Sequence, residues 1–198
     1  MNPIRSSRVC AFAFAVMAAN AFGANGVIEI NHAKILASGG YPYQIGSAGS
    51  YILTSNLAPP LNTNALTFAS SAVTLDLNGF SIIGTGNPPC GAVPTAIAAL
   101  GTVTNHLRIR NGYVFGFCIG ISLGTTEDVT VENVHVTTIG NGGIYTGINA
   151  IIRGNHFNAP NSGINCPSIV VDTSFVGSLG NNGIPTATCA KANLIGNF

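Results

Sequence analysis

The chain contains no tryptophan and few charged residues. Its 198 residues include seven Lys and Arg and six Asp and Glu, which together make up 7% of the chain. So few cations exclude the basic patch of a typical nucleic-acid-binding protein. Because 46% of the residues are hydrophobic, the composition also lies far from that of a disordered protein. We therefore expect one folded domain with a hydrophobic core and no nucleic-acid partner.

Several repeat signatures are also missing. Beyond the first two dozen residues, no apolar periodicity is long enough for the paired helices of a helical solenoid. The Leu-x-x-Leu-x-Leu pattern of leucine-rich repeats is absent, and so is the Gly- and Asp-rich nonapeptide of calcium-binding β-rolls. These absences leave architectures built from short strands.

A hydrophobic run long enough to span a membrane is lacking at the N-terminus. Arg5 and Arg8 precede the 14-residue run "VCAFAFAVMAANAF", which ends with the small residues around Ala21. A membrane-spanning helix needs about 20 apolar residues, whereas this arrangement is typical of a secretory signal peptide. We therefore expect residues 1–23 to be removed on export to the periplasm or the medium, with no membrane span remaining.

Removal of this segment changes the charge and the cysteine count. Five Lys and Arg remain with all six Asp and Glu, so the formal net charge becomes −1. Cys10 is lost, and Cys90, Cys118, Cys166 and Cys189 remain, an even number in a protein bound for an oxidising compartment. We expect two disulfides. Four cysteines can form two disulfides in three ways, and their number alone does not decide among these pairings.

A Gly-Ile pair recurs along the second half of the chain. It occurs at residues 120–121, 143–144, 163–164 and 183–184, at intervals of 23, 20 and 20 residues. Between these pairs lie segments such as "HLRIRNGYV" and "DVTVENVHV", which alternate apolar and polar residues as half-buried strands do. The repeat unit therefore holds short strands joined by Gly and Asn turns.

Short strands with this period predict an all-β fold, a single-stranded parallel β-helix with a short N-terminal cap. Each coil would stack about 4.8 Å above the previous one, with Gly permitting a bend and Ile filling the core. We assign residues 24–43 to the cap segment and 44–198 to the β-helix. Within residues 27–40 the pattern predicts a short helix, with Asn31 as its N-cap and Gly39 as its end.

The cysteine spacings fit these coils. Cys166 and Cys189 are separated by the length of one coil, and Cys90 and Cys118 are separated by one coil plus the insertion "GNPPCGAVP". Each pair could therefore bridge adjacent coils.

An earlier stretch extends the scheme and carries a family resemblance. In "AVTLDLNGFSIIGTG" at residues 72–86, alternation places Val73, Leu75 and Leu77 in the core. The segment "VTLDLNGFSI", preceded by "GSYILTSNL" and followed by coils with Asn at the turns, resembles secreted bacterial right-handed β-helix proteins of the pectin-lyase-like superfamily. The resemblance covers roughly residues 44–198. It implies a right-handed coil and an association with polysaccharides, but no particular reaction.

Aligning the coils places charged residues in one outward column. The column contains Asp76, Arg110, Glu132 and Arg153, and Asp172 follows if the register holds. As structural pairs between neighbouring strands, opposite charges would contribute roughly 0.2 to 1 kcal/mol each. As the floor of a sugar-binding groove, Arg110 and Arg153 would hold a uronate carboxylate, and Asp76 or Glu132 would accept a hydroxyl hydrogen bond or a proton.

A second column contains Tyr113, His135 and His156, which are separated by the same coil length. Histidine can act as a general base near neutral pH, and an aromatic ring suits the apolar face of a sugar. The alternative is a stacked polar column without a ligand. Two histidines without a clear third ligand do not make a zinc site, so we expect neither metal nor cofactor. The strand phenylalanines, Phe115 and Phe117 among them, are expected in the core or at its rim.

The sequence supports three function hypotheses. In the first, an exported protein contacts polysaccharide along an outer face through Arg110, Arg153 and Tyr113. In the second, it is a lyase or hydrolase with Asp76, Glu132, His135 and His156 as catalytic candidates, although no paired aspartates occur on neighbouring coils. In the third, it is a structural or adhesive surface protein that self-associates through its C-terminal coil, which ends in "ANLIGNF".

Overall fold

The protein is described by a computed structural model that covers residues 26–86, 90, 94–101, 105–124, 126–147, 149–158, 164–165, 168–171 and 174–175. Its elements are β1 (Val27–Ile30), α1 (His32–Ala37), β2 (Tyr43–Ile45), β3 (Gly49–Leu53), β4 (Leu66–Phe68), β5 (Val73–Asp76), β6 (Ser81–Ile83), β7 (Thr95–Ala99), β8 (Leu107–Ser122), β9 (Thr130–Tyr145), β10 (Ala150–Arg153), β11 (His156–Asn158), β12 (Ile164–Asn165), β13 (Ser168–Val171) and β14 (Ser174–Phe175).

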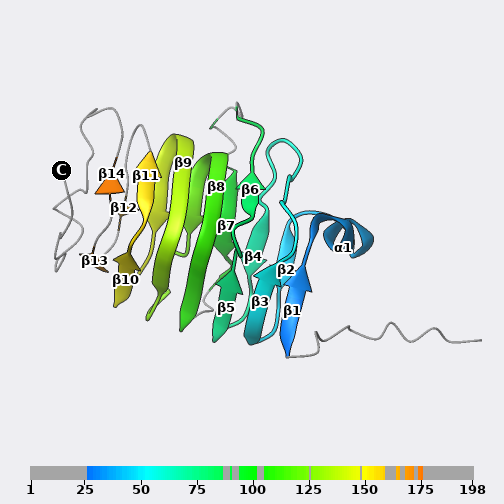
Figure 1. Cartoon of the computed structure of the whole chain (residues 1–198), viewed down its shortest axis with the longest axis horizontal. Coiled ribbons are helices and arrows are strands. Elements are labelled where there is room, and N and C mark those ends of the chain that lie inside the picture. The colour runs from blue at the N-terminus through cyan, green and yellow to red at the C-terminus, as the bar shows by residue number, and fades with distance from the viewer. Residues whose placement is uncertain are drawn as a thin grey trace, which may run out of the picture.

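Parallel strands stack into a β-solenoid of about five turns (Figure 1). We call each turn a rung. The rungs form three parallel stacks of strands, the first of which is β1-β3-β5-β8-β9-β10-β13. The second is β6-β8-β9-β11-β14, and the third is β2-β4-β7-β8-β9-β12. The 16-residue strands β8 and β9 run through all three stacks, which we call the first, second and third sheets. The predicted all-β parallel solenoid is confirmed.

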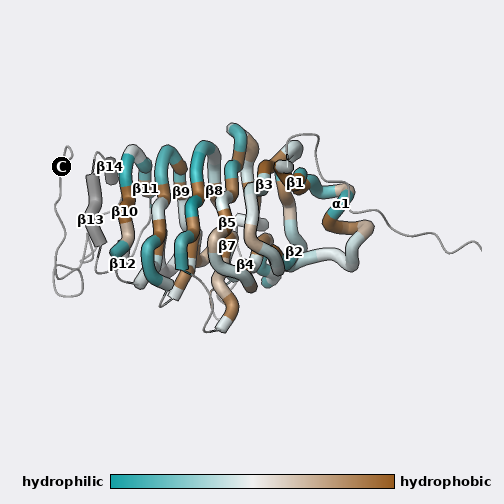
Figure 2. The backbone as a smooth tube through the Cα atoms, turned by 90° about the horizontal axis from the view of Figure 1, so that it is seen from below, coloured by the Kyte–Doolittle hydropathy of each residue, from teal (hydrophilic) through white to brown (hydrophobic). Residues whose placement is uncertain are grey.

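Alternation along each strand builds the core. Leu75, Ile109, Val131 and Ile152 occupy equivalent positions on successive rungs and have no exposed surface. The alternate residues along each strand point outward. Hydrophobic and hydrophilic positions therefore alternate along the strands in Figure 2. Val73 and Leu77 are buried, as predicted.

The corner between the first and second sheets has a recurrent backbone conformation. One residue in each of four rungs adopts a positive φ of 52° to 61° there. Asn and Gly tolerate this left-handed conformation better than other residues, so they suit this position. The residues are Asn78, Asn111, Asn133 and Gly154.

The short helix expected near the N-terminus is α1. The Oδ1 atom of Asn31 accepts a hydrogen bond of 2.8 Å from the Lys34 N–H, as the predicted N-cap would. The helix ends before Gly39, which has a φ of 109°, and it buries Ile35 in the core. In the same segment, β1 pairs in parallel with β3 and so adds a strand to the first sheet.

The Gly-Ile repeat marks the third sheet, where Ile121, Ile144 and Ile164 are register partners. Ile121 and Ile144 are fully buried, as predicted. The expected bend at glycine is wrong for Gly120, which lies within β8 without a positive φ. A Cβ there would lie 2.7 Å from the Gly143 carbonyl oxygen and would also meet the Val136 side chain. Gly120 is therefore required for close approach of the rungs.

We expect Gly120→Ala to lower the free energy of unfolding by about 1 to 3 kcal/mol, because the added methyl group overpacks the interior. Urea denaturation measures this change. Gly46→Ala is the matched control, because a Cβ at the exposed Gly46 would meet nothing within 4 Å. Equal stability of the two variants would contradict the steric explanation.

One of the predicted disulfides is present. Cys90 and Cys118 are joined, which is compatible with an oxidising compartment. Cys166, Cys189 and the C-terminal coil lie outside the described residues. In the part of the chain that the structure describes, no helix is long and apolar enough to cross a membrane.

Candidate functional site

The charged column lies on the outer face of the first sheet, in the predicted register. Asp76 is the partner of Arg110, Arg110 of Glu132, and Glu132 of Arg153. The next partner of Arg153 is Val171 rather than Asp172, which lies outside the described residues. Alternation of β-strand side chains therefore places the four charges on one face, and the lengths of the coils place them on consecutive rungs.

Glu132 is held by two arginines. Arg153 donates to its Oε2 atom from Nε at 2.9 Å and from Nη2 at 2.6 Å. Arg108 donates to its Oε1 atom from Nε at 2.6 Å and also from Nη2. Sequence reasoning missed Arg108, which lies two residues before Arg110 and reaches Glu132 diagonally between strands. The sequence could have indicated Arg108, because alternation in the same segment places it on the same outward face as Arg110.

The two arginines cover the carboxylate. The Glu132 side chain is 7% exposed, whereas the side chains of Arg108 and Arg153 are 43% and 54% exposed. Burial acts to raise the pKa of Glu132, but the hydrogen bonds and positive charges of Arg153 and Arg108 outweigh it and lower the pKa. Glu132 therefore stays ionised near neutral pH and points its oxygens at arginines.

Asp76 is also occupied by neighbouring groups. Arg110 donates to its Oδ2 atom at 2.9 Å, the Asn111 side chain donates at 3.2 Å, and the Asn78 N–H donates to Oδ1 at 2.8 Å. These contacts fix the corner that follows the first sheet. Catalytic roles for Asp76 and Glu132 remain predictions, and both carboxylates have partners inside the protein.

We call Asp76, Arg108, Arg110, Glu132 and Arg153 the arginine strip. It contains three of the four Lys and Arg residues in the described ranges, with one more cation than carboxylates. An arginine has five N–H donors, and each of these guanidinium groups is partly exposed. Donors remain that can bind an anionic or hydroxyl-bearing ligand.

Across the Asn corner, the second sheet carries the predicted ring column. Tyr113 is the register partner of His135, and His135 is the partner of His156. The ring centroids are 5.2 Å apart for Tyr113–His135 and 5.3 Å apart for His135–His156, with tilted planes. We call these residues the ring ladder. Tyr113 and His135 are exposed, and His156 is partly exposed.

The next outward column of the same sheet extends this surface. Phe115, Thr137 and Asn158 are register partners on the rungs that carry the ring ladder. Phe115 is 38% exposed beside Tyr113 at 45%, whereas Phe117 is buried in the core. The expected placement of the phenylalanines in the core or at its rim is therefore confirmed for Phe117. Phe115 adds apolar area to an outer face, a contribution that the sequence did not indicate.

A metal centre finds no support among these side chains. The described residues contain no group of three or more His, Cys, Asp and Glu that could hold a metal ion. The ring ladder offers two histidines, and the nearby carboxylates of the arginine strip already accept from guanidinium groups.

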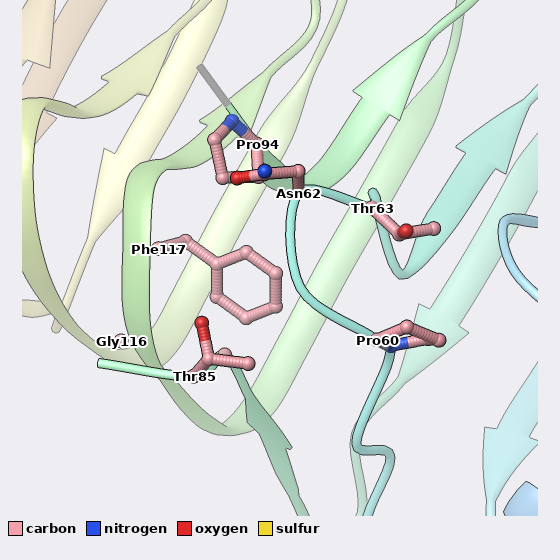
Figure 3. A pocket seen from close by; sticks show the side chains of 8 residues that line it. Pro60, Asn62, Thr63, Thr85, Pro94, Gly116 and Phe117 are labelled. Atoms are coloured by element: carbon pink, nitrogen blue, oxygen red, sulfur yellow. The ribbon is translucent and has the colours of Figure 1, made fainter. Parts of the chain in front are cut away.

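A shallow hollow lies at the corner between the second and third sheets (Figure 3). Its cavity volume is about 10 Å³, far below the roughly 300 Å³ of a small-molecule site. Its lining contains no ionisable side chain: Pro60, Asn62, Thr63, Gly84, Thr85, Pro94, Gly116 and Phe117. The hollow therefore offers no acid, base or charged group for chemistry.

The chain matches no protein-family model, and no curated protein or solved structure is significantly similar to it. The function must therefore be argued from the side chains on the outer faces of the solenoid.

Proposed function

We propose that the protein binds an extended polysaccharide along the solenoid axis, over the ring ladder and beside the arginine strip. The observation that carries this proposal is the continuous, outward-facing series Tyr113, His135 and His156 on three consecutive rungs. A ligand that repeats along its length can make the same kind of contact at each rung.

The chemistry of this face suits a sugar chain. Tyr113 and Phe115 supply exposed aromatic area for the apolar faces of sugar rings. The Tyr113 hydroxyl group, the imidazole nitrogens of His135 and the hydroxyl group of Thr137 can exchange hydrogen bonds with sugar hydroxyls. The partly exposed arginines across the corner add donors for acidic groups on the ligand.

The contacts of the carboxylates favour binding over catalysis. A glycoside hydrolase needs one carboxyl group that can give a proton and a second that can act as base or nucleophile. Glu132 is nearly buried, has a lowered pKa and has both oxygens directed at arginines. Asp76 accepts from three groups of its own protein. We therefore propose a binding protein without hydrolase activity.

We also propose that the protein is exported and that it belongs to a known superfamily of β-helix proteins. The segment "VTLDLNGFSI" and the solenoid fold support a bacterial right-handed member of the pectin-lyase-like superfamily. The pattern of residues 1–23 and the Cys90–Cys118 disulfide support secretion or a periplasmic location.

We expect the double variant Tyr113→Ala and Phe115→Ala to bind polysaccharide about tenfold more weakly, because it loses the exposed aromatic area of the second sheet. Affinity electrophoresis against a panel of neutral and acidic polysaccharides measures retention. Leu100→Ala is the control, because Leu100 is 43% exposed and follows β7 of the third sheet.

Retention of the double variant equal to that of the native protein would remove the ring ladder from the binding surface. The same panel also tests the absence of catalysis. Release of new reducing ends from any of these polysaccharides would overturn the non-catalytic assignment.

A further inference from the structure

We infer that the polysaccharide carries an anionic group on its repeating unit, and that Arg108 and Arg110 of β8 select the ligand by binding this group. The inference rests on the proposed function, because it names the chemical class of the same ligand. It is carried by two arginines on one strand that turn toward opposite neighbouring rungs and keep further N–H donors.

The two guanidinium groups lie in the column that borders the Asn corner. Arg110 belongs to this column and donates from Nε to Asp76 of β5 at 2.9 Å. Arg108 belongs to the adjacent outward column, but its Nε atom donates to Glu132 of β9 at 2.6 Å, which brings its guanidinium group toward the corner. Tyr113 follows on the same strand, across the corner. A polysaccharide that lies over this ring therefore passes beside both arginines.

Each of the two arginines keeps donors for a ligand. An arginine has five N–H groups. Arg108 uses Nε and Nη2, both toward Glu132, and Arg110 uses Nε toward Asp76. In the described part of the chain, the Nη1 atoms of both arginines have no partner, and both side chains are partly exposed. A carboxylate can accept two parallel bonds from a guanidinium group, and the oxygens of a sulfate ester offer the same anionic acceptors.

The carboxylates of the strip hold the arginines in place before a ligand binds. Glu132 is nearly buried and accepts from Arg108 on one oxygen and from Arg153 on the other. Asp76 is fixed by the Asn78 N–H at 2.8 Å. A long side chain loses rotamer freedom when it binds a ligand, and these internal pairs have already restricted that freedom. A new bond between the ligand and either arginine is therefore less offset by the cost of ordering the side chain.

The side chains that flank Arg108 in its own column carry no charge. Its register partners on β5 and β9 are Thr74 and Thr130, and both are half-buried. Neither adds a carboxylate that would compete with an anionic ligand. Their hydroxyl groups can exchange hydrogen bonds with sugar hydroxyls. An anionic group of the ligand can therefore approach Arg108 between two neutral side chains.

The test uses two matched pairs of polymers. One pair is alginate, a polymer of uronic acids, and alginate whose carboxyl groups have been chemically reduced; the other is dextran sulfate and dextran. Calorimetry at neutral pH measures the affinities of the native protein and of Arg108→Ala. We expect the native protein to prefer a charged polymer over its uncharged partner, and Arg108→Ala to bind that charged polymer on the order of fivefold more weakly, the effect of one exposed charge pair. Its affinity for the uncharged partner should not change.

Two further variants separate a specific contact from the general charge of the protein. Lys34→Ala removes the other cation of the described ranges, which lies in α1 and donates to the Glu29 carbonyl oxygen. This variant should bind the charged polymers as the native protein does. Arg108→Lys keeps a positive charge beside Glu132 but replaces the planar fork of donors with a single ammonium group, so it should recover only part of the lost affinity.

The outcomes separate this inference from the proposed function. Equal affinities of the native protein and Arg108→Ala for the charged polymers, or an equal loss in Lys34→Ala, would overturn the inference. Uncharged polymers that bind the native protein as tightly as the charged ones would also overturn it, and the proposed function would stand. Failure of all four polymers to bind contradicts the inference, whereas the proposed function fails only if no polysaccharide of the electrophoresis panel retains the protein.

Discussion

Opening the Cys90–Cys118 disulfide is expected to lower the free energy of unfolding by roughly 3 to 4 kcal/mol. The two cysteines are 28 residues apart, and a cross-link that closes a loop of this length restricts the unfolded chain by about that amount. The strand register shows which rung contains the loop that the disulfide closes. The chain is longer between the partners Asp76 and Arg110 than between the partners Arg110 and Glu132, so the loop belongs to an enlarged rung.

Packing around the bond adds to this effect. Cys118 lies in β8 and is fully buried. A Cβ on Gly140, in the next rung, would meet the Sγ atom of Cys90, so the disulfide lies directly against the β9 backbone. Release of Cys90 would therefore loosen a contact between rungs.

The measurement compares oxidised and reduced forms of one sequence, in which all other cysteines are replaced by serine. The two forms then differ only in the single S–S bond, and urea denaturation gives the difference in stability. Equal midpoints for the oxidised and reduced forms would contradict the prediction.

The register of the outer faces could be predicted from the sequence because one physical rule determines it. Side chains in a strand alternate with a period of two, and the nearly constant length of the coils then places outward residues in columns. The columns of Arg110, Glu132 and Arg153 and of the ring ladder are register partners for that reason.

The ion pairs within the arginine strip could not be predicted from the residues of one column alone. Arginine is long enough to reach a diagonal neighbour, and Arg108 therefore contacts Glu132 from the adjacent outward column. The role of Gly120 was hidden for a different reason. A glycine in the sequence does not distinguish a left-handed backbone from a lack of space for a Cβ, and only the distance to Gly143 shows the second.

We expect Asn155→Ala to lower the free energy of unfolding by about 3 kcal/mol, because it leaves buried backbone groups without a partner. Asn155 is only 2% exposed and lies at the corner between the arginine strip and the ring ladder. Its Oδ1 atom accepts from the Val134 N–H at 2.9 Å, and its Nδ2 atom donates to the Val131 carbonyl oxygen at 2.9 Å. Both partners belong to the preceding rung.

A second amide provides the matched comparison for Asn155. The Oδ1 atom of Asn56 accepts from the Ser81 N–H, also at 2.9 Å, but Asn56 is exposed. Water can replace that bond, so Asn56→Ala should cost about 1 kcal/mol or less. Hydrogen exchange should show the same contrast, with fast exchange of the Val134 amide in Asn155→Ala. Equal costs for the two variants would mean that the buried amide does not join the rungs.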